Sequence, residues 1–269
     1  MLTDTRNATT GNPVAERCGY RYGSKGTHTS RTIMLEELSQ VLDSVPSTGT
    51  RHDYVSAVID SNVTEKKTVA TRRQTFQRLS ELYGLDPSLV LFRVLRQFWD
   101  TDRAGRPLLA LLCALARDPL LRLSSPVVLA LKPGEELSRQ QMIHAIQTTT
   151  AKRLNVDSID KVVRNCSSSW AQSGHLDGRV RKIRRRVEAT PLSAAYALLL
   201  GYLQGVRGGQ LFRTPWSQVL DAAAEQLVHL ARDAKRLGVL DLKQAGEVVE
   251  IGFSSLLTRD EMRDSYGKN

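Results

Sequence analysis

Hydrophobic positions along most of the chain recur every three or four residues, which is the spacing of an amphipathic helix. In one clear case, Val69, Phe76, Leu79 and Tyr83 precede Gly84, a residue that suits a helix end. At several places a capping residue directly precedes proline, a pair that starts helices well. These pairs are Asp86-Pro87, Asp118-Pro119, Ser125-Pro126, Thr190-Pro191 and Thr214-Pro215. The pattern therefore predicts an all-α, mainly helical protein.

The hydrophobic spacing changes near the C-terminus. A long helix is predicted over residues 215–237, ending before Gly238. In the alternating segment that follows, Leu240 and Leu242 share one face, and Val249 and Ile251 share another. The Gln-Ala-Gly sequence at 244–246 then predicts the turn of a β-hairpin. Since a helix followed by a hairpin also fits an earlier segment, we expect one or two short β-hairpins.

Composition along the chain predicts three parts. The first 30 or so residues are rich in Gly, Thr, Asn and Ser and show no apolar periodicity, which indicates a mobile arm. We therefore expect a flexible N-terminal arm over residues 1–50, an N-terminal helical domain over 51–135 and a C-terminal, winged-helix-like helical domain over 136–269.

The most informative segment is a pair of helices after residue 136. Ser138 and Gln141 have the spacing of a capping box, and this helix is expected to end near Asn155. The second helix has a narrow apolar stripe at Ile159, Val162, Val163, Cys166 and Trp170. Side chains that suit base edges and phosphates project from its opposite face. They are Lys161, Arg164, Asn165, Ser168 and Gln172.

A strongly basic run follows this helix. After the Asp177-Gly178 turn signal, six of the eight residues from 179 to 186 are basic. They are Arg179, Arg181, Lys182, Arg184, Arg185 and Arg186. Helix, turn, polar-faced helix and basic hairpin occur here in the order of a winged helix-turn-helix, with the second helix for the major groove. The alternative is that residues 179–187 continue as a basic helix, because Val180, Ile183 and Val187 also fit helical spacing.

A second basic patch lies upstream. Lys66, Lys67, Arg72, Arg73 and Arg78 have no acidic residue among them. Arg72 and Arg73 fall near the start of a predicted helix, where positive charge opposes the helix dipole, which favours a role in phosphate contact. A plain solvated helix face is the alternative interpretation.

Overall composition favours an anionic partner and argues against several other classes. The chain has 269 residues and a formal charge of +10, with 41% hydrophobic residues. No apolar run is long enough to cross a bilayer, and the first residues lack a secretion pattern, so we expect a cytoplasmic protein without membrane contact. The three distant cysteines are typical of reduced thiols. Without metal-ligand spacing or a phosphate-binding loop, we expect no cofactor, no metal and no enzymatic activity.

Two stretches carry a resemblance to a known family. They are SNVTEKKTVATRRQTFQRLSELYGL at 61–85 and FWDTDRAGRPLLALLCALARDPLLR at 98–122, and the polar-faced helix and hairpin follow them. From about Asn62 onward the chain resembles BrxA, the small helical component of the BREX bacteriophage-exclusion systems. The resemblance rests on Thr71, Arg72 and Arg73 opening a helix and on the apolar helix at 108–116. It implies a non-enzymatic protein that binds double-stranded DNA beside separate methyltransferase, ATPase and phosphatase-like subunits.

The sequence thus favours a protein that binds duplex DNA mainly through phosphate contacts and supports assembly of a larger complex, with other defence-system proteins as partners. The alternative is a helical adaptor whose basic face binds an acidic protein or structured RNA. The face of the second helix separates these functions, because an adaptor does not need base-reading side chains beside a basic hairpin.

Overall fold

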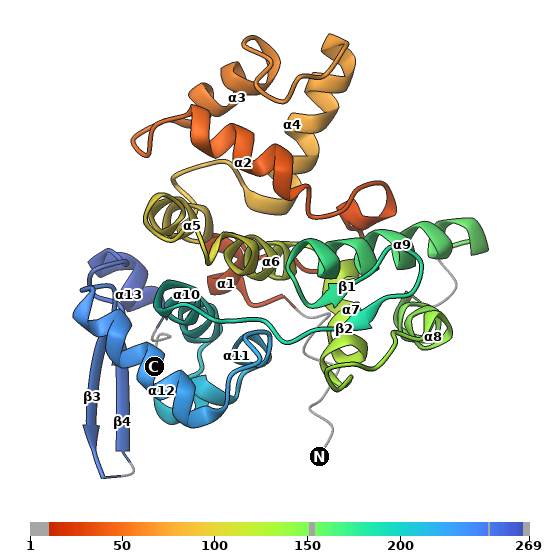
Figure 1. Cartoon of the computed structure of the whole chain (residues 1–269). Helices are drawn as coiled ribbons and strands as arrows, with labels where there is room; N and C mark the ends of the chain where they lie inside the picture. The colour runs from red at the N-terminus through yellow and green to blue at the C-terminus, as the bar shows by residue number, and fades with distance from the viewer. Residues whose placement is uncertain (1–10, 151–153, 247, 266–269) are drawn as a thin grey trace.

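A computed structural model describes residues 11–150, 154–246 and 248–265, which are mostly helical, with two small antiparallel hairpins (Figure 1). The elements, in chain order, are α1 (Pro13–Cys18), η2 (Thr27–Thr29), α2 (Leu35–Ser44), α3 (Arg51–Ile59), α4 (Val69–Tyr83), α5 (Val90–Thr101), α6 (Arg106–Arg117), α7 (Pro119–Leu129), α8 (Arg139–Thr150), α9 (Val156–Gln172), β1 (Leu176–Asp177), β2 (Ile183–Arg184), α10 (Pro191–Leu203), η3 (Gly208–Arg213), α11 (Pro215–Gln218), α12 (Ala224–Arg236), β3 (Asp241–Ala245), β4 (Val248–Gly252) and α13 (Arg259–Ser265).

Capping side chains followed by proline begin three of the helices where the sequence predicts them. Asp118, Thr190 and Thr214 cap α7, α10 and α11, and each side-chain oxygen accepts an N–H of the first turn. Two other predicted starts are wrong. Asp86 bonds Ser88 in a turn before α5, and Pro126 lies inside α7. Pro126 removes only one helical hydrogen bond there, and the flanking Ser124 and Val128 stay buried.

Two helices, α6 and α10, form the centre of the core (Figure 1). Every residue from Leu108 to Arg117 in α6 is buried, and so is every residue from Leu192 to Leu203 in α10. The two helices contact each other, and α4, α5 and α12 pack around them. No helix in the described part of the chain combines the length and the apolarity needed to cross a bilayer.

The segment predicted as a mobile arm is packed into this core from residue 11 onward. It contains α1, η2 and α2, and Ala15, Ile33 and Leu38 are fully buried. The hydroxyl of Tyr20 donates to the carbonyl of Leu200 at 2.7 Å, across 180 positions of the chain. The arm prediction is therefore wrong for residues 11–50, because scattered apolar side chains find places against other helices. Residues 1–10 lie outside the described part.

The predicted boundary between residues 135 and 136 falls between α7 and α8. A single cluster of buried apolar side chains includes residues from both sides of it, such as Leu109 and Leu198. The two parts therefore share a hydrophobic core. That residues 51–135 and 136–269 are separate domains stays a prediction.

The C-terminal helix and hairpin differ from the prediction in their details. The helix expected over 215–237 is divided into α11 and α12, and Asp221 lies between them with a positive φ of 52°. The β3–β4 hairpin is confirmed, with Leu242 opposite Ile251 and Ala245 opposite Val248. This register places the turn between Ala245 and Val248, slightly later than the predicted 244–246.

Candidate nucleic-acid interface

The helix α9 is built as its apolar spacing predicts. Asn155 caps it by accepting the N–H of Ser158 at 2.9 Å. The five residues of the predicted stripe, Ile159, Val162, Val163, Cys166 and Trp170, are all buried. Helix α9 contacts α7, α8 and η2, and it lies beside α8 (Figure 1).

The N-terminal half of α9 leaves two cationic side chains exposed. Lys161 is exposed, and the side chain of Arg164 is 65% exposed. The nearest carboxylate to Arg164 is Asp160, one turn earlier, and the two groups are 4.0 Å apart. Exposed pairs of this kind are weak, so both cations are available to an anionic ligand.

The C-terminal half of α9 is covered by η2 and the segment that follows it. The amide of Asn165 donates to the carbonyl of His28 at 2.8 Å. Gln172 accepts the N–H of Leu35 at 3.1 Å and donates to the hydroxyl of Thr32 at 3.0 Å. Asn165 and Gln172 are thus removed from the predicted reading surface, since their polar groups hold the N-terminal segment. Ser168, also predicted for that surface, is half-buried.

A buried hydrogen-bonded chain that the sequence did not reveal joins this segment to α7 and α9. The His28 ring lies 2.9 Å from Asp118 Oδ2 and 2.8 Å from Ser169 Oγ. Burial would raise the pKa of the Asp118 carboxyl, but the His28 ring and the backbone N–H groups of Leu121 and His28 bring it below its usual range. The order resembles a hydrolase triad, but all three side chains are buried and Ser169 also bonds Ile33 and Asn165. Their arrangement is that of a packing network.

The basic run after α9 forms a short hairpin, so the helical alternative for residues 179–187 is wrong. Leu176 pairs with Arg184, and Asp177 pairs with Ile183. The turn needs a glycine at position 178, where φ is 97° and a Cβ would clash with the carbonyl oxygen of Arg181. A third segment, residues 134–137, joins the other side of β2. Its bonds are Gly134 N to Arg184 O, Arg184 N to Glu135 O and Leu137 N to Lys182 O, at 2.8–2.9 Å.

Five of the six predicted basic contacts in this hairpin lie at least partly at the surface. Arg179, Arg181, Arg185 and Arg186 are exposed, and Lys182 is half-buried. Arg181 pairs with Glu136 at 2.6 Å, and Arg185 pairs with Asp177 at 3.1 Å. The two arginines lower the pKa values of these two carboxyl groups. Arg186 donates to the carbonyl of Asp221.

Arg184, the sixth, is a correction to the sequence prediction. Its side chain is only 3% exposed and forms an ion pair with Asp221. The same guanidinium donates to the carbonyl of Val128 at 3.2 Å. A buried and fully bonded arginine cannot contact DNA, so Arg184 anchors the hairpin instead. The residues beside Arg184 in the sequence do not indicate this role, because its carboxylate partner, Asp221, lies 37 residues later.

The upstream basic patch is also divided by the structure. Lys66 pairs with Glu37 at 2.9 Å, and Arg72 donates to the carbonyls of Lys66 and Ile59. Arg72 therefore stabilises the turn before α4. This structural role accounts for a positive charge in the first turn of the helix, and no phosphate contact is needed to explain it. Arg78 pairs with Glu81 at 2.8 Å. Lys67 and Arg73 stay exposed, and Arg73 lines a surface hollow of about 500 Å³ with Ala70, Thr71, Gln74 and Gln77.

Within the described ranges, no three His, Cys, Asp or Glu side chains are grouped as a metal site. Cys18, Cys113 and Cys166 are free and buried. Burial raises the pKa of the Cys113 thiol to about 11, which leaves it unreactive at neutral pH.

No model of a protein family matches the sequence, and no curated protein is significantly similar to it.

Proposed function

We propose that this protein binds duplex DNA through a winged helix-turn-helix formed by residues 119–187. The observation that supports this most is the order and pairing of the elements. Helix α7 is followed by the extended residues 134–137, then by α8, α9, β1 and β2. Strand β2 lies between residues 134–137 and β1. A winged helix has this order, with its third helix in the major groove and its hairpin beside the backbone.

The exposed cations of α9 suit this role. Lys161 and Arg164 lie in the N-terminal half of the helix, the part of a recognition helix that contacts base edges. An arginine there can bond guanine with two N–H groups, whereas a lysine or arginine near a phosphate adds affinity for any sequence.

The hairpin supplies the backbone contacts in this proposal. Arg179 and Lys182 lie in the turn, and Arg181 and Arg185 pair with the exposed carboxylates of Glu136 and Asp177. Such exposed ion pairs are weak and are screened by salt. A phosphate can therefore replace Glu136 or Asp177 as the partner at small cost, with a charge-assisted bond of similar geometry.

The test is a titration of the protein with a 30-base-pair duplex at several salt concentrations. If about six phosphates are neutralised, log K falls with log salt at a slope of roughly −5. The variant with Lys161→Ala and Arg164→Ala is expected to bind the duplex about 10-fold or more weakly, from roughly 1–3 kcal/mol for a lost base contact. The variant with Arg259→Ala and Arg263→Ala on α13 removes the same charge elsewhere and is the control.

Binding that is independent of salt, or equal binding by both variants, overturns the proposal. The same titration with duplex RNA and with single strands separates it from the adaptor alternative. An adaptor for structured RNA prefers the duplex RNA, and an adaptor for an acidic protein binds none of the nucleic acids tightly.

We also propose a defence context, which rests on the resemblance to BrxA. In this proposal the protein is a non-enzymatic member of a BREX-type system and contacts its other proteins on DNA. The neighbouring genes test this part separately, because a BREX system requires methyltransferase, ATPase and phosphatase-like subunits beside it.

A further inference from the structure

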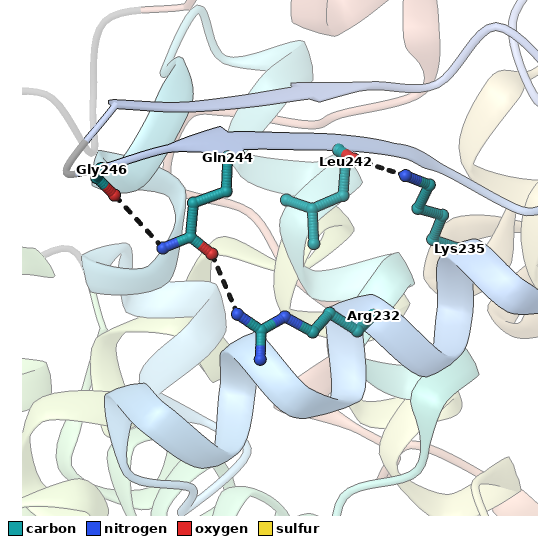
Figure 2. A pocket seen from close by; sticks show the side chains of 5 residues that line it. All are labelled: Arg232, Lys235, Leu242, Gln244 and Gly246. Carbon is teal, nitrogen blue, oxygen red and sulfur yellow. Dashed lines mark hydrogen bonds between the residues drawn. The ribbon is translucent and has the colours of Figure 1, made fainter.

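A second surface, far along the chain from α9, also combines a helix, a hairpin and free positive charge. The β3–β4 hairpin lies beside α12, and a hollow of about 430 Å³ opens between them (Figure 2). Two cations from α12, Arg232 and Lys235, line it together with Leu242, Gln244 and Gly246 from the hairpin. We call this hollow the α12 groove.

The two cations of the α12 groove are held by neutral oxygen atoms. Arg232 donates to the side-chain oxygen of Gln244 at 3.0 Å, and Lys235 donates to the carbonyl of Leu242 at 2.8 Å (Figure 2). Nearby cations outside the groove have carboxylates instead: Arg236 pairs with Asp233 at 2.7 Å, and Lys243 pairs with Glu250 at 3.7 Å. Among the described residues that line the groove there is no carboxylate, so these residues give it a net positive charge.

The register of the hairpin explains this separation of charge. Leu242 lies opposite Ile251 and Gln244 opposite Val249, and the side chains of these pairs share the face toward α12. Lys243 and Glu250 are opposite each other on the other face. Leu242 and Ile251 are buried and attach the hairpin to the helix, which gives the groove a fixed wall.

The elements around the groove repeat the plan of the first module. Helix α10 is followed by η3 and α11, then by α12 and the β3–β4 hairpin. The start of η3 lies against β4, because a Cβ at Gly208 would come within 2.8 Å of the carbonyl oxygen of Val249. Residues 134–137 likewise lie beside β2, although there the two segments are joined by backbone hydrogen bonds. Helix α12 and its hairpin thus correspond to α9 and the β1–β2 hairpin.

We propose that the α12 groove binds phosphate groups of a nucleic-acid backbone, as a second contact point besides α9. Phosphate oxygens would replace the neutral acceptors of Arg232 and Lys235 with charge-assisted hydrogen bonds, which are about twice as strong. This inference rests on the proposed function only in assuming that α9 and the groove bind the same duplex.

The experiment compares two variants on the 30-base-pair duplex. Arg232→Gln with Lys235→Gln removes the two groove cations, and Arg236→Gln with Lys243→Gln removes two charges from the same elements outside the groove. The groove variant is expected to lower the steepness of the salt slope by about two, and the control by much less. Thermal melting verifies that both variants fold. Equal slopes for the two variants overturn the inference.

Lysine modification provides an independent readout in the unmutated protein. A saturating duplex is expected to slow the acylation of Lys235 at least threefold, while Lys243 on the opposite face reacts as in the free protein. Equal reactivity of Lys235 with and without the duplex contradicts the inference.

The two proposals fail in different ways. If only the α9 variant with Lys161→Ala and Arg164→Ala loses affinity, the α12 groove is not a contact and the proposed function stands. If only the groove variant loses affinity, α9 is not the reading helix and the groove inference stands. If the unmutated protein binds neither duplex nor single strands at micromolar concentration, both are overturned.

Discussion

Two buried polar residues hold the β1–β2 hairpin against the C-terminal part of the molecule. Arg184 pairs with Asp221, and the His175 ring donates from Nε2 to the carbonyl of Val219 at 2.7 Å. The other ring nitrogen, Nδ1, lies 2.9 Å from the hydroxyl of Ser173. Both side chains bond residues in the turn between α11 and α12, so this turn fixes the position of the β1–β2 hairpin relative to α9.

His175 is expected to make the protein less stable in mild acid. Burial lowers the pKa of its ring to about 4 from an ordinary value of 6.5. Between these values the unfolded chain binds the proton and the folded chain does not, so the free energy of unfolding falls as the pH decreases from about 6.5 toward 4. Urea unfolding at several pH values measures this decrease. Carboxyl groups whose pKa is lowered in the folded protein, such as Asp118, change the free energy of unfolding at a lower pH.

The control for this prediction is a second histidine. His175→Gln is expected to flatten the decrease in stability between pH 6.5 and 4, whereas His52→Gln changes an exposed ring and is expected to leave it unchanged. A His175→Gln variant with the same pH dependence as the parent would show that another group titrates.

At the scale of the element, α9 has two halves with different neighbours. Its first half presents Lys161 and Arg164 to solvent, while its second half bonds the segment 28–35 through Asn165 and Gln172. The sequence pattern places these four residues of α9 on the same face of the helix. The second half is an internal packing surface because α4 and α9 both contact η2, which lies between them.

Gln172→Ala is expected to lower the stability of the protein and leave its DNA affinity unchanged. The substitution removes the partners of the Leu35 N–H and the Thr32 hydroxyl, for about 1–3 kcal/mol in the free energy of unfolding. Arg164→Ala is the matched variant in the same helix and is expected to change stability by less than about 0.5 kcal/mol. Denaturant unfolding and DNA titration on both variants test this division. Weaker DNA binding by a stable Gln172→Ala protein would place the reading surface on the second half.

At the scale of the whole molecule, the N-terminal segment and both predicted domains share one buried cluster. Ile33 and Tyr83 illustrate the connection, since the Tyr83 hydroxyl donates to the carbonyl of Ile33 across 50 positions of the chain. Each part buries apolar surface contributed by another, and such a molecule is expected to unfold cooperatively.

Ile33→Ala is therefore expected to destabilise the whole chain. Ile33 is fully buried, and losing its methyl and methylene groups leaves a cavity at a cost of about 2–5 kcal/mol. Tryptophan fluorescence and circular dichroism should follow one coincident transition at a lower temperature. Val69→Ala, at an exposed position, is the control. Two separate transitions, or an unchanged melting temperature for Ile33→Ala, would show that the N-terminal segment packs loosely.

Local patterns in the chain were enough to predict the helical class, the apolar stripe of α9, the β3–β4 hairpin and several helix starts, while the β1–β2 hairpin was one of two alternatives for the basic run. These are local properties, because a cap or a 3.6-residue period is decided within one or two turns of chain. It also located the exposed cations Lys161, Arg164, Arg179 and Arg181.

The packing of distant segments, by contrast, determines which polar side chains are exposed and which are bonded inside the protein. Arg184, Asn165 and Gln172 share the patterns of exposed residues, but their partners are 37 to 140 positions away. The place of residues 11–50 in the core and the break at Asp221 were likewise decided by distant contacts. Hydrogen bonds and burial between distant segments depend on how the helices pack, and a local pattern carries no record of that packing.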